Sequence, residues 1–218
     1  MWRWPKSALR KGQGVPRMTV VRRAQRRAEI LEAAESCFAR LGFHLTTMRD
    51  VIAEAGLSAG CVYKHFTSKH EIITAIAADR HASEMNLLTG AEVAQDPITA
   101  LRGLSRSFIE QLETSAGMKS RTVGVQTWAE ALHDDEVLRH VRRGVEQPLA
   151  KIAALMSRAQ KEGRLVATVD PVALARASIA LFHGFVLQKL WNPKVAAEPY
   201  LRAIDAILAG LVIDKPKR

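Results

Sequence analysis

Seven consecutive residues near position 60 combine small, cationic and donor-bearing side chains. They form the stretch AGCVYKH, from Ala59 to His65. If this stretch is helical, Val62 and Phe66 share one face at i, i+4 and are expected to be buried. The opposite face then presents Ala59, Gly60, Cys61, Tyr63, Lys64 and His65. Small residues allow close approach to a groove floor, and Tyr, Lys and His can donate to phosphates or base edges, so this face suits DNA.

The residues before this face predict a second short helix joined to it by a tight turn. Thr47, with Asp50 three positions later, is typical of a capping box at a helix start. Gly56 suits the end of that helix, and Ser58 can cap the next one, which we expect over about residues 59–66. Two helices joined by a glycine-containing turn of three or four residues have helix-turn-helix geometry. A helical hairpin that serves only packing is the alternative.

Further helices are predicted on both sides of this pair. Apolar residues recur at helical period over residues 22–41, and Gly42 suits the end of that helix. Ser68 can cap a helix that starts near Lys69 and runs to about residue 88. We expect this last helix to be the link between the DNA-binding part and the rest of the chain.

Positive charge is concentrated at the N-terminus. The chain of 218 residues has a net charge of +10, and residues 1–27 contain nine Lys or Arg residues and no acid. We expect residues 1–21 to form a disordered basic arm, at least part of which contacts DNA. The alternatives are a tail that only aids solubility and a natural start at Met18.

The remainder predicts a larger helical region with little β-structure. Asp96-Pro97 and Asp170-Pro171 each place an N-cap acid before a proline at the first helical position. Pro148 is expected to kink or split the longest helix. The expected helices span about residues 97–115, 121–133, 136–161, 171–191 and 197–212. The fold class is therefore all-α.

The last two predicted helices are apolar almost all round, which requires burial on several sides. We expect two such helices from each subunit to form a four-helix bundle in a homodimer with C2 symmetry. A monomer core is the alternative. The predicted interface residues are Ile179, Phe182, Val186, Leu190, Ile204, Leu208 and Leu211.

Large apolar side chains on the inner faces of different helices could together line a cavity for a small molecule. The candidates are Phe108, Trp128, Met156, Phe182 and Phe185. Core packing is the default for each of them. Arg106, Gln126 or Glu130 could supply polar contacts to a ligand.

Other chemistry has little support. Two cysteines, Cys37 and Cys61, do not make a disulfide scaffold and favour a reduced cytoplasmic setting. His133, Asp134, Asp135 and His140 lack the short fixed spacing of a metal site, so we expect a solvated turn there, no metal and no cofactor. No phosphate-binding glycine loop or nucleophile elbow is present, which argues against an enzyme. Polar residues interrupt the apolar segment 172–191, so we expect a buried helix rather than a membrane span.

The segment ILEAAESCFARLGFHLTTMRDVIAEAGLSAGCVYKHFTSKHEII resembles the DNA-binding domain of the TetR family of bacterial transcription regulators. The resemblance covers about residues 24–73. The segments WAEALHDDEVLRHV and ALFHGFVLQKLW are similar to the regulatory domains of the BetI-like branch. The matching positions are Phe38, Gly42, Thr46, Thr47, Gly56, Ser58, Gly60, Tyr63, Phe66, Ser68 and Lys69.

The resemblance implies a homodimer that places two recognition helices in successive major grooves of a near-palindromic operator in double-stranded DNA. By position, Thr47, Tyr63 and Lys69 would contact phosphates. Ser58, Gly60, Cys61, Lys64 and His65 would face the groove. Ile52, Cys61 and Thr67 depart from the residues that are common in the family at these positions.

The sequence therefore predicts a helix-turn-helix domain over residues 22–68 and a regulatory and dimerisation domain over residues 69–218. The expected function is a sequence-specific regulator, most often a repressor in this family, that a small-molecule effector of unknown identity releases from DNA. The rival hypothesis is a non-specific architectural DNA-binding protein.

Overall fold

The computed structural model describes residues 17–92 and 95–213. All the regular elements in these ranges are helices, and one isolated antiparallel bridge pairs Leu165 with Val212. The all-α prediction is thus confirmed. The helices are α1 (Arg17–Leu45), α2 (Met48–Ala55), α3 (Ala59–Tyr63), α4 (Lys69–Glu92), α5 (Pro97–Gln111), α6 (Ser115–Glu130), α7 (Asp135–Lys161), α8 (Pro171–Trp191) and α9 (Ala197–Ala209).

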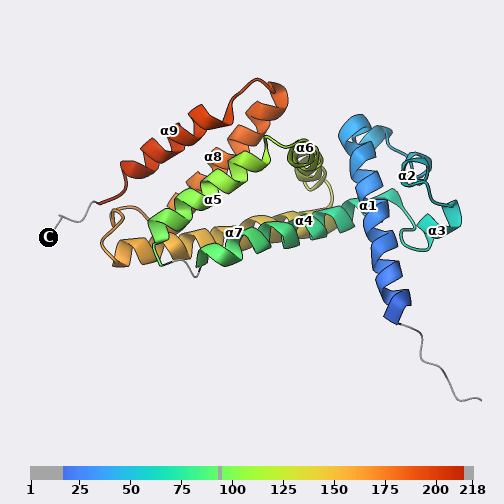
Figure 1. The fold of residues 1–218 in the computed structure, drawn as a ribbon, viewed down its shortest axis with the longest axis horizontal. Helices are drawn as coiled ribbons and strands as arrows, with labels where there is room; N and C mark the ends of the chain where they lie inside the picture. The colour runs from blue at the N-terminus through green and yellow to red at the C-terminus, as the bar shows by residue number, and fades with distance from the viewer. Residues whose placement is uncertain (1–16, 93–94, 214–218) are drawn as a thin grey trace, which may run out of the picture.

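The chain forms two bodies connected lengthwise by long helices (Figure 1). Helices α1, α2 and α3 make a small body at one end. Helices α4 and α7 lie side by side and run from that body to the other end, where α5 and α8 pack with α7, and α9 packs with α5. Helix α6 lies between the two, in contact with α1 on one side and with α7 and α8 on the other.

The predicted caps are present where local sequence alone determines them. Thr47 and Asp50 form the reciprocal capping box of α2, and Gly56 ends that helix in the left-handed conformation at φ 62°. The hydroxyl of Ser58 accepts from the N–H of Cys61 at the start of α3, at 3.3 Å. Asp96 and Asp170 cap α5 and α8 ahead of their prolines.

Several predicted boundaries differ from the structure. Helix α1 begins at Arg17, so residues 17–21 are helical rather than part of a disordered arm, and residues 1–16 of that arm lie outside the described residues. Gly42 interrupts the helix as predicted, at φ 81°, but a further short helical segment follows it and extends α1 to Leu45. Helix α3 is shorter than predicted and ends at Tyr63. Pro148 is accommodated inside α7 and does not split it.

The core around α1–α3 is not closed by those helices alone. It includes Ile72, Ile73 and Ile76 from the first turns of α4, which lie beyond the predicted domain boundary at residue 68. Val123 and Ala131 from the region of α6, and Val137 from α7, belong to the same core. Two further clusters bury the interior of α4, α5, α7, α8 and α9. The small body is therefore packed directly against the larger one.

Candidate functional site

The exposed face of α3 has the arrangement that the sequence predicts. Val62 is fully buried and Phe66 is 4% exposed, and both belong to the core around α1–α3. The opposite face carries Ala59, Gly60, Tyr63 and Lys64, which are exposed, and Cys61 and His65, which are half-buried. Side chains able to donate hydrogen bonds thus protrude from one short helix whose other face is anchored. Their contact with DNA remains a prediction.

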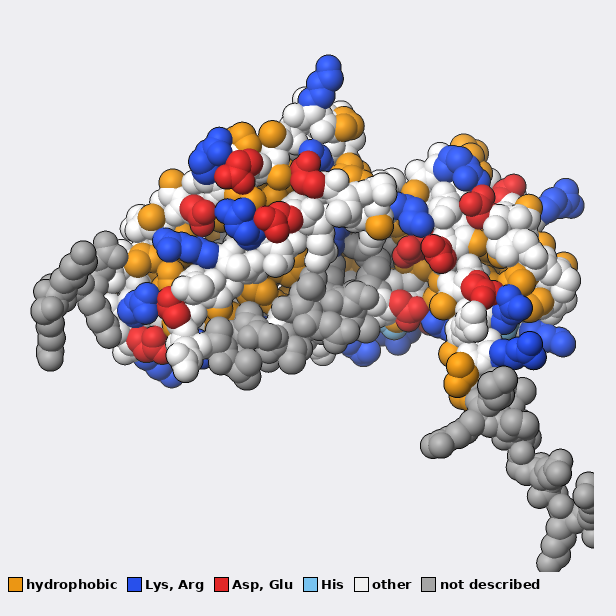
Figure 2. Space-filling model, viewed as in Figure 1, with side chains coloured by type: hydrophobic (Ala, Val, Ile, Leu, Met, Phe, Trp, Pro, Cys, Tyr) orange, Lys and Arg blue, Asp and Glu red, His pale blue; other side chains and the backbone are white. Residues whose placement is uncertain are grey.

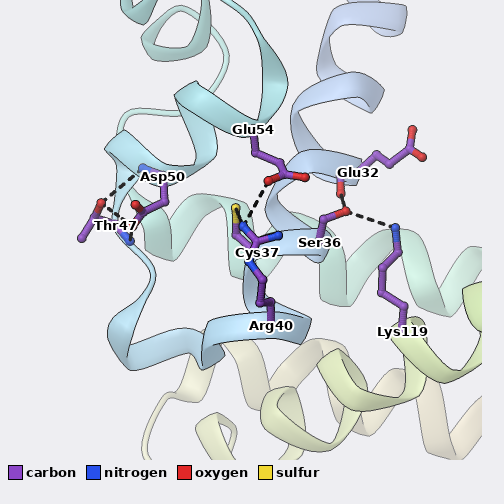
Figure 3. A network of polar contacts seen from close by, with 8 residues as sticks. All are labelled: Glu32, Ser36, Cys37, Arg40, Thr47, Asp50, Glu54 and Lys119. Atoms are coloured by element: carbon purple, nitrogen blue, oxygen red, sulfur yellow. Dashed lines mark hydrogen bonds and ion pairs between the residues drawn. The ribbon is translucent and has the colours of Figure 1, made fainter.

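The start of α2, which is also predicted to contact DNA, is fixed by local hydrogen bonds and an ion pair. The main-chain N–H of Thr47 donates to Oδ2 of Asp50 at 2.8 Å, and the Thr47 hydroxyl donates to the same oxygen at 2.7 Å (Figure 3). These hydrogen bonds hold the pKa of the Asp50 carboxyl below its ordinary value. Arg40 of α1 pairs with Glu54 of α2 at 3.1 Å, so α2 is also fixed to α1. Because its hydroxyl hydrogen is already used by Asp50, Thr47 would contact a phosphate through a rearranged hydroxyl.

Lys69, a predicted phosphate contact, is engaged inside the protein. Its ammonium donates to the main-chain oxygens of Phe43 and Thr46, the latter at 2.9 Å, and more weakly to that of His44 at 3.4 Å. These are carbonyls at the C-terminal end of α1, where a positive charge is favourable. Lys69 therefore ties the start of α4 to the end of α1, and a phosphate would have to compete with these carbonyls.

The arginines of α1 divide into two kinds. Arg26 pairs with Glu29, and Arg27 pairs with Asp79 of α4 at 2.9 Å while its guanidinium lies 5.5 Å from the ring centre of Phe66. Arg22 and Arg23 are exposed and continue the run of basic residues. Figure 2 shows Lys and Arg side chains gathered at the outer edge of the small body.

A cavity of about 170 Å³ lies between α5, α7, α8 and α9. Phe108, Met156 and Phe182, three of the five predicted pocket residues, line it. Trp128 and Phe185 do not. Phe185 is fully buried elsewhere and stacks on Tyr200 with ring centres 4.3 Å apart. Helical period showed that these two side chains point inward, but it could not show toward which neighbour.

The polar residues predicted for this pocket do not line it either. The guanidinium of Arg106 pairs with Glu110 and Glu198 on the outside of α5 and α9. Gln126 makes its hydrogen bonds to α1. Glu130 is also absent from the cavity wall, whose polar side chains are Ser105, Ser178 and His183.

Most of the residues predicted for the dimer interface border the cavity or the core of the single chain, and their part in an interface stays a prediction. Ile179, Phe182, Ile204, Leu208 and Leu211 line the cavity. Val186 is fully buried, and Leu190 packs against the third core cluster. In helices that are apolar all round, the sequence does not show which stripe faces the core. The large apolar residues most exposed on α8 and α9 are Val172, Leu181, Trp191 and Ile207, with exposed fractions from 38% to 76%, and Leu181 and Ile207 also border the cavity.

Helix α6 contains a contact that sequence reasoning missed. The side-chain oxygen of Gln126 accepts from the N–H of Phe43 at 2.8 Å, and its amide nitrogen donates to the main-chain oxygen of Phe38 at 3.0 Å. Both groups flank Gly42, whose φ of 81° breaks α1. Lys119, also on α6, donates to the hydroxyl of Ser36 on α1 at 3.3 Å (Figure 3). The available signal was a glycine inside a helical pattern, but nothing in the sequence pairs it with Gln126.

The other side of α6 contacts the cavity wall. The guanidinium of Arg121 lies 5.1 Å from the ring centre of Phe182, and the rings of Trp128 and His183 are 4.6 Å apart. Phe182 and His183 both line the cavity. The sequence predicted α4 as the link between the two bodies. Helix α6 contacts both bodies as well, so α4 is not the only link among the described helices.

Residues 133–140 show no metal arrangement. Asp134 caps α7, and its carboxylate lies 2.7 Å from Nε2 of His70 on α4. In the part of the chain that the structure describes, no three His, Cys, Asp or Glu side chains could hold a metal ion together. Helix α8 is long and apolar enough to cross a membrane by length and composition, but one such helix is weak evidence. Only 17% of its most apolar stretch is buried within the single chain.

An anchored short helix with an outward donor-rich face, preceded by a capped helix and joined to a helical body with a cavity, defines a helix-turn-helix DNA-binding regulator. Residues 30–76 match the model of bacterial regulatory proteins of the tetR family, and residues 100–212 match that of the BetI-type transcriptional repressor C-terminal domain. The chain belongs to the TetR family of bacterial transcription regulators, whose members are not enzymes.

Individual relatives agree with this assignment. The chain is 27% identical over 170 residues to the regulator TtgR of Pseudomonas putida. This match covers 77% of this chain and 81% of TtgR. It is 49% identical over 61 residues to YfiR of Bacillus subtilis, a match that covers 28% of this chain and 30% of YfiR. A solved structure of SmeT, the repressor of a Stenotrophomonas maltophilia multidrug efflux pump, superposes on this chain with a TM-score of 0.69. The two sequences are 30% identical, and the match covers 86% of this chain and 91% of the SmeT chain. The structure of a SmeT–triclosan complex superposes on this chain with a TM-score of 0.75. Its sequence is 27% identical to this chain, and the match covers 89% of this chain and 98% of the SmeT chain.

Proposed function

We propose that this protein is a cytoplasmic homodimeric repressor that binds a near-palindromic operator and is released from it when a small molecule enters the cavity. The observation that carries the proposal is helix α6, which contacts the cavity wall through Arg121 and Trp128 and contacts α1 through Gln126. Helix α6 thus lies between the cavity, where an effector would bind, and the helices that would contact DNA. SmeT, with its triclosan complex, supports a small-molecule site in a relative of the same fold.

The DNA contacts would come from the exposed face of α3 and from the start of α2. Lys64 and His65 would contact base edges, while Tyr63 and Thr47 would contact phosphates. Gly60 and Ala59 would let the helix approach the groove floor. Arg22 and Arg23, exposed on α1, would add phosphate contacts beside the recognition helix.

The dimer would form through the outer faces of α8 and α9. Trp191 is 76% exposed and Ile207 is 54% exposed, and exposed alanines lie along both helices. Exposed apolar area of this kind favours burial against a second copy. Two copies would then present two α3 helices to half-sites about 34–36 Å apart.

The release mechanism would be a population shift. An effector that presses on Phe182 and His183 would favour one placement of α6, since Arg121 and Trp128 pack on those residues. Gln126 would carry the change to the break in α1 and so alter the spacing of the two recognition helices. The effector shifts the equilibrium only by its difference in affinity for the two placements.

The test is selection of random duplex DNA by the purified full-length protein at about 150 mM salt, where phosphate contacts are weakened. Recovery of one inverted repeat supports a dimeric regulator that recognises sequence. Unenriched DNA would contradict the proposal and favour the architectural alternative. Small molecules that release the protein from the recovered repeat would then identify it as effector-responsive.

A further inference from the structure

The cavity wall contains a main-chain carbonyl that lacks its regular helical partner. Pro148 lies inside α7 and has no N–H, so the carbonyl of Gly144, four residues earlier, loses the donor of an uninterrupted helix. Gly144 and Pro148 both line the cavity. Gly144 also has no side chain to cover its own backbone. The cavity is therefore bordered by an acceptor that a ligand could satisfy.

The serine hydroxyls of the wall are acceptors too. Oγ of Ser105 donates to the main-chain oxygen of Leu101 at 3.1 Å, and Oγ of Ser178 donates to that of Leu174 at 3.0 Å. Each hydroxyl hydrogen is thus already used within its own helix, which leaves lone pairs for a partner. The Gly144 carbonyl and these two hydroxyls can therefore accept from a hydrogen-bond donor on the ligand, and His183 is the third polar side chain of the wall.

The rest of the wall excludes charge. Among the described residues that line the cavity there is no Lys, Arg, Asp or Glu, and the large majority are Leu, Ile, Met, Phe, Ala and Pro. An anion would leave water with no Lys or Arg in the wall to pair it, which costs several kcal/mol. A cavity of about 170 Å³ is also small, since an apolar cavity of about 150 Å³ holds benzene.

We propose that the effector is a neutral compound of one or two rings that carries a hydroxyl or N–H donor, which the Gly144 carbonyl accepts. The serine hydroxyls are secondary acceptors for the same donor. This inference rests on the proposed function, because it assigns the ligand of the same cavity. It adds the chemical class of that ligand and the group that recognises it.

The test uses three compounds with one skeleton: 4-tert-butylphenol, its methyl ether 4-tert-butylanisole, and the anion 4-tert-butylbenzoate. Each is titrated calorimetrically into the full-length protein without DNA. We expect the phenol to bind about tenfold more tightly than the ether, since the ether leaves a buried acceptor unpaired, and the benzoate not to bind. Equal binding of phenol and ether, tightest binding of the benzoate, or no binding of any of the three overturns the proposal.

The acceptor is tested by Pro148→Ala, which supplies an N–H at position 148 for the Gly144 carbonyl. We expect this variant to bind the phenol about tenfold more weakly and the ether as before. The matched control is Pro171→Ala, at the first turn of α8, where a missing N–H leaves no carbonyl without its helical donor. An unchanged phenol preference in Pro148→Ala overturns the assignment to Gly144.

The two proposals fail separately. Binding is measured here without DNA, so the phenol can show the expected preference and still leave the operator complex intact, in which case the proposed release mechanism fails and the ligand class stands. If another class of compound releases the operator while the phenol does not bind, the ligand class fails and the regulator proposal stands.

Discussion

The side-chain oxygen of Gln126 accepts a hydrogen bond from the main-chain N–H of Phe43 at 2.8 Å. In an uninterrupted helix that N–H would bond to the carbonyl four residues earlier, but Gly42, at φ 81° and ψ 165°, breaks α1 at this point. The amide nitrogen of Gln126 donates to Phe38 on the other side of the break. One side chain from α6 therefore satisfies main-chain groups of both parts of α1.

Replacing Gln126 with leucine keeps the size of the side chain but removes both hydrogen bonds. We expect a loss of about 1–3 kcal/mol in the free energy of unfolding, because two half-buried main-chain groups lose their partner. Denaturant unfolding measures it, with Gln147→Leu, at an exposed site of α7, as the control. If Gln126 also carries the effector signal, the variant binds effector normally but is released from DNA less. Full release with normal stability would contradict both roles.

Gly42 is expected to be costly to replace because of its backbone conformation. Its backbone conformation is one that side chains rarely adopt, while an added Cβ would lie 3.7 Å from Oε1 of Gln126, an ordinary contact. The cost of Gly42→Ala is therefore backbone strain, about 1–3 kcal/mol. Gly103→Ala, inside α5 with open space around the added Cβ, should instead stabilise by up to about 1 kcal/mol. Thermal unfolding of the two variants should shift in opposite directions.

The Lys69 contacts change what its removal should do. The sequence alone predicts a phosphate contact, so that removing Lys69 would weaken DNA binding at all sequences and lower the salt slope by about one. Since its ammonium already bonds main-chain oxygens of Phe43 and Thr46, we expect Lys69→Met to reduce stability and to leave the slope unchanged. Binding across a salt series, with Arg23→Gln as the comparison for a lost phosphate contact, separates the two. A slope reduced by one in Lys69→Met would restore the phosphate role.

The features that the sequence predicts correctly are local ones. The capping box of Thr47 and Asp50 and the left-handed turn at Gly56 depend on residues within a few positions of each other. Local sequence motifs therefore predict them. The buried face of α3 follows in the same way from Val62 and Phe66.

The features that it misses depend on distant partners. Gln126 lies more than 80 residues from Phe43, and no local rule relates them. The role of the apolar faces of α8 and α9 depends on distant partners too. Ile204 and Leu208 of α9 are apolar, as an interface requires, but they line the cavity. Only the packing of α9 against α5 shows which of its apolar stripes faces inward.

Stability should fall in acid because three helix caps use ionised carboxylates. Hydrogen bonds from Thr47, from Thr99 and from the N–H of Val137 lower the folded-state pKa of Asp50, Asp96 and Asp134 respectively below the ordinary 3.8. A lowered folded pKa gives stability that is present above the unfolded pKa and lost as pH falls through the folded value. We therefore expect the urea concentration at the unfolding midpoint to fall as the pH is lowered below about 4.

A variant separates these caps from general acid effects. In Asp96→Asn the amide still caps α5 but no longer titrates, so the midpoint should depend less steeply on pH below about 4 than in the natural protein. An identical pH profile would mean that the Asp96 carboxylate does not contribute. Asp205→Asn, at a half-buried acid inside α9 that caps no helix, is the matched control.

The outer face of α8 and α9 should determine the oligomeric state. Ala180 and Ala206 are exposed, on the helices that carry Leu181 and Ile207. Arginine at both positions would place unpaired charges in an apolar interface, so we expect Ala180→Arg/Ala206→Arg to be a monomer in light scattering, near 24.1 kDa. Binding to an inverted repeat should weaken strongly, while helix content stays the same. Ala154→Arg, at an exposed position of α7, should remain a dimer. A natural protein that is already monomeric at micromolar concentration would show instead that this apolar face meets no second copy.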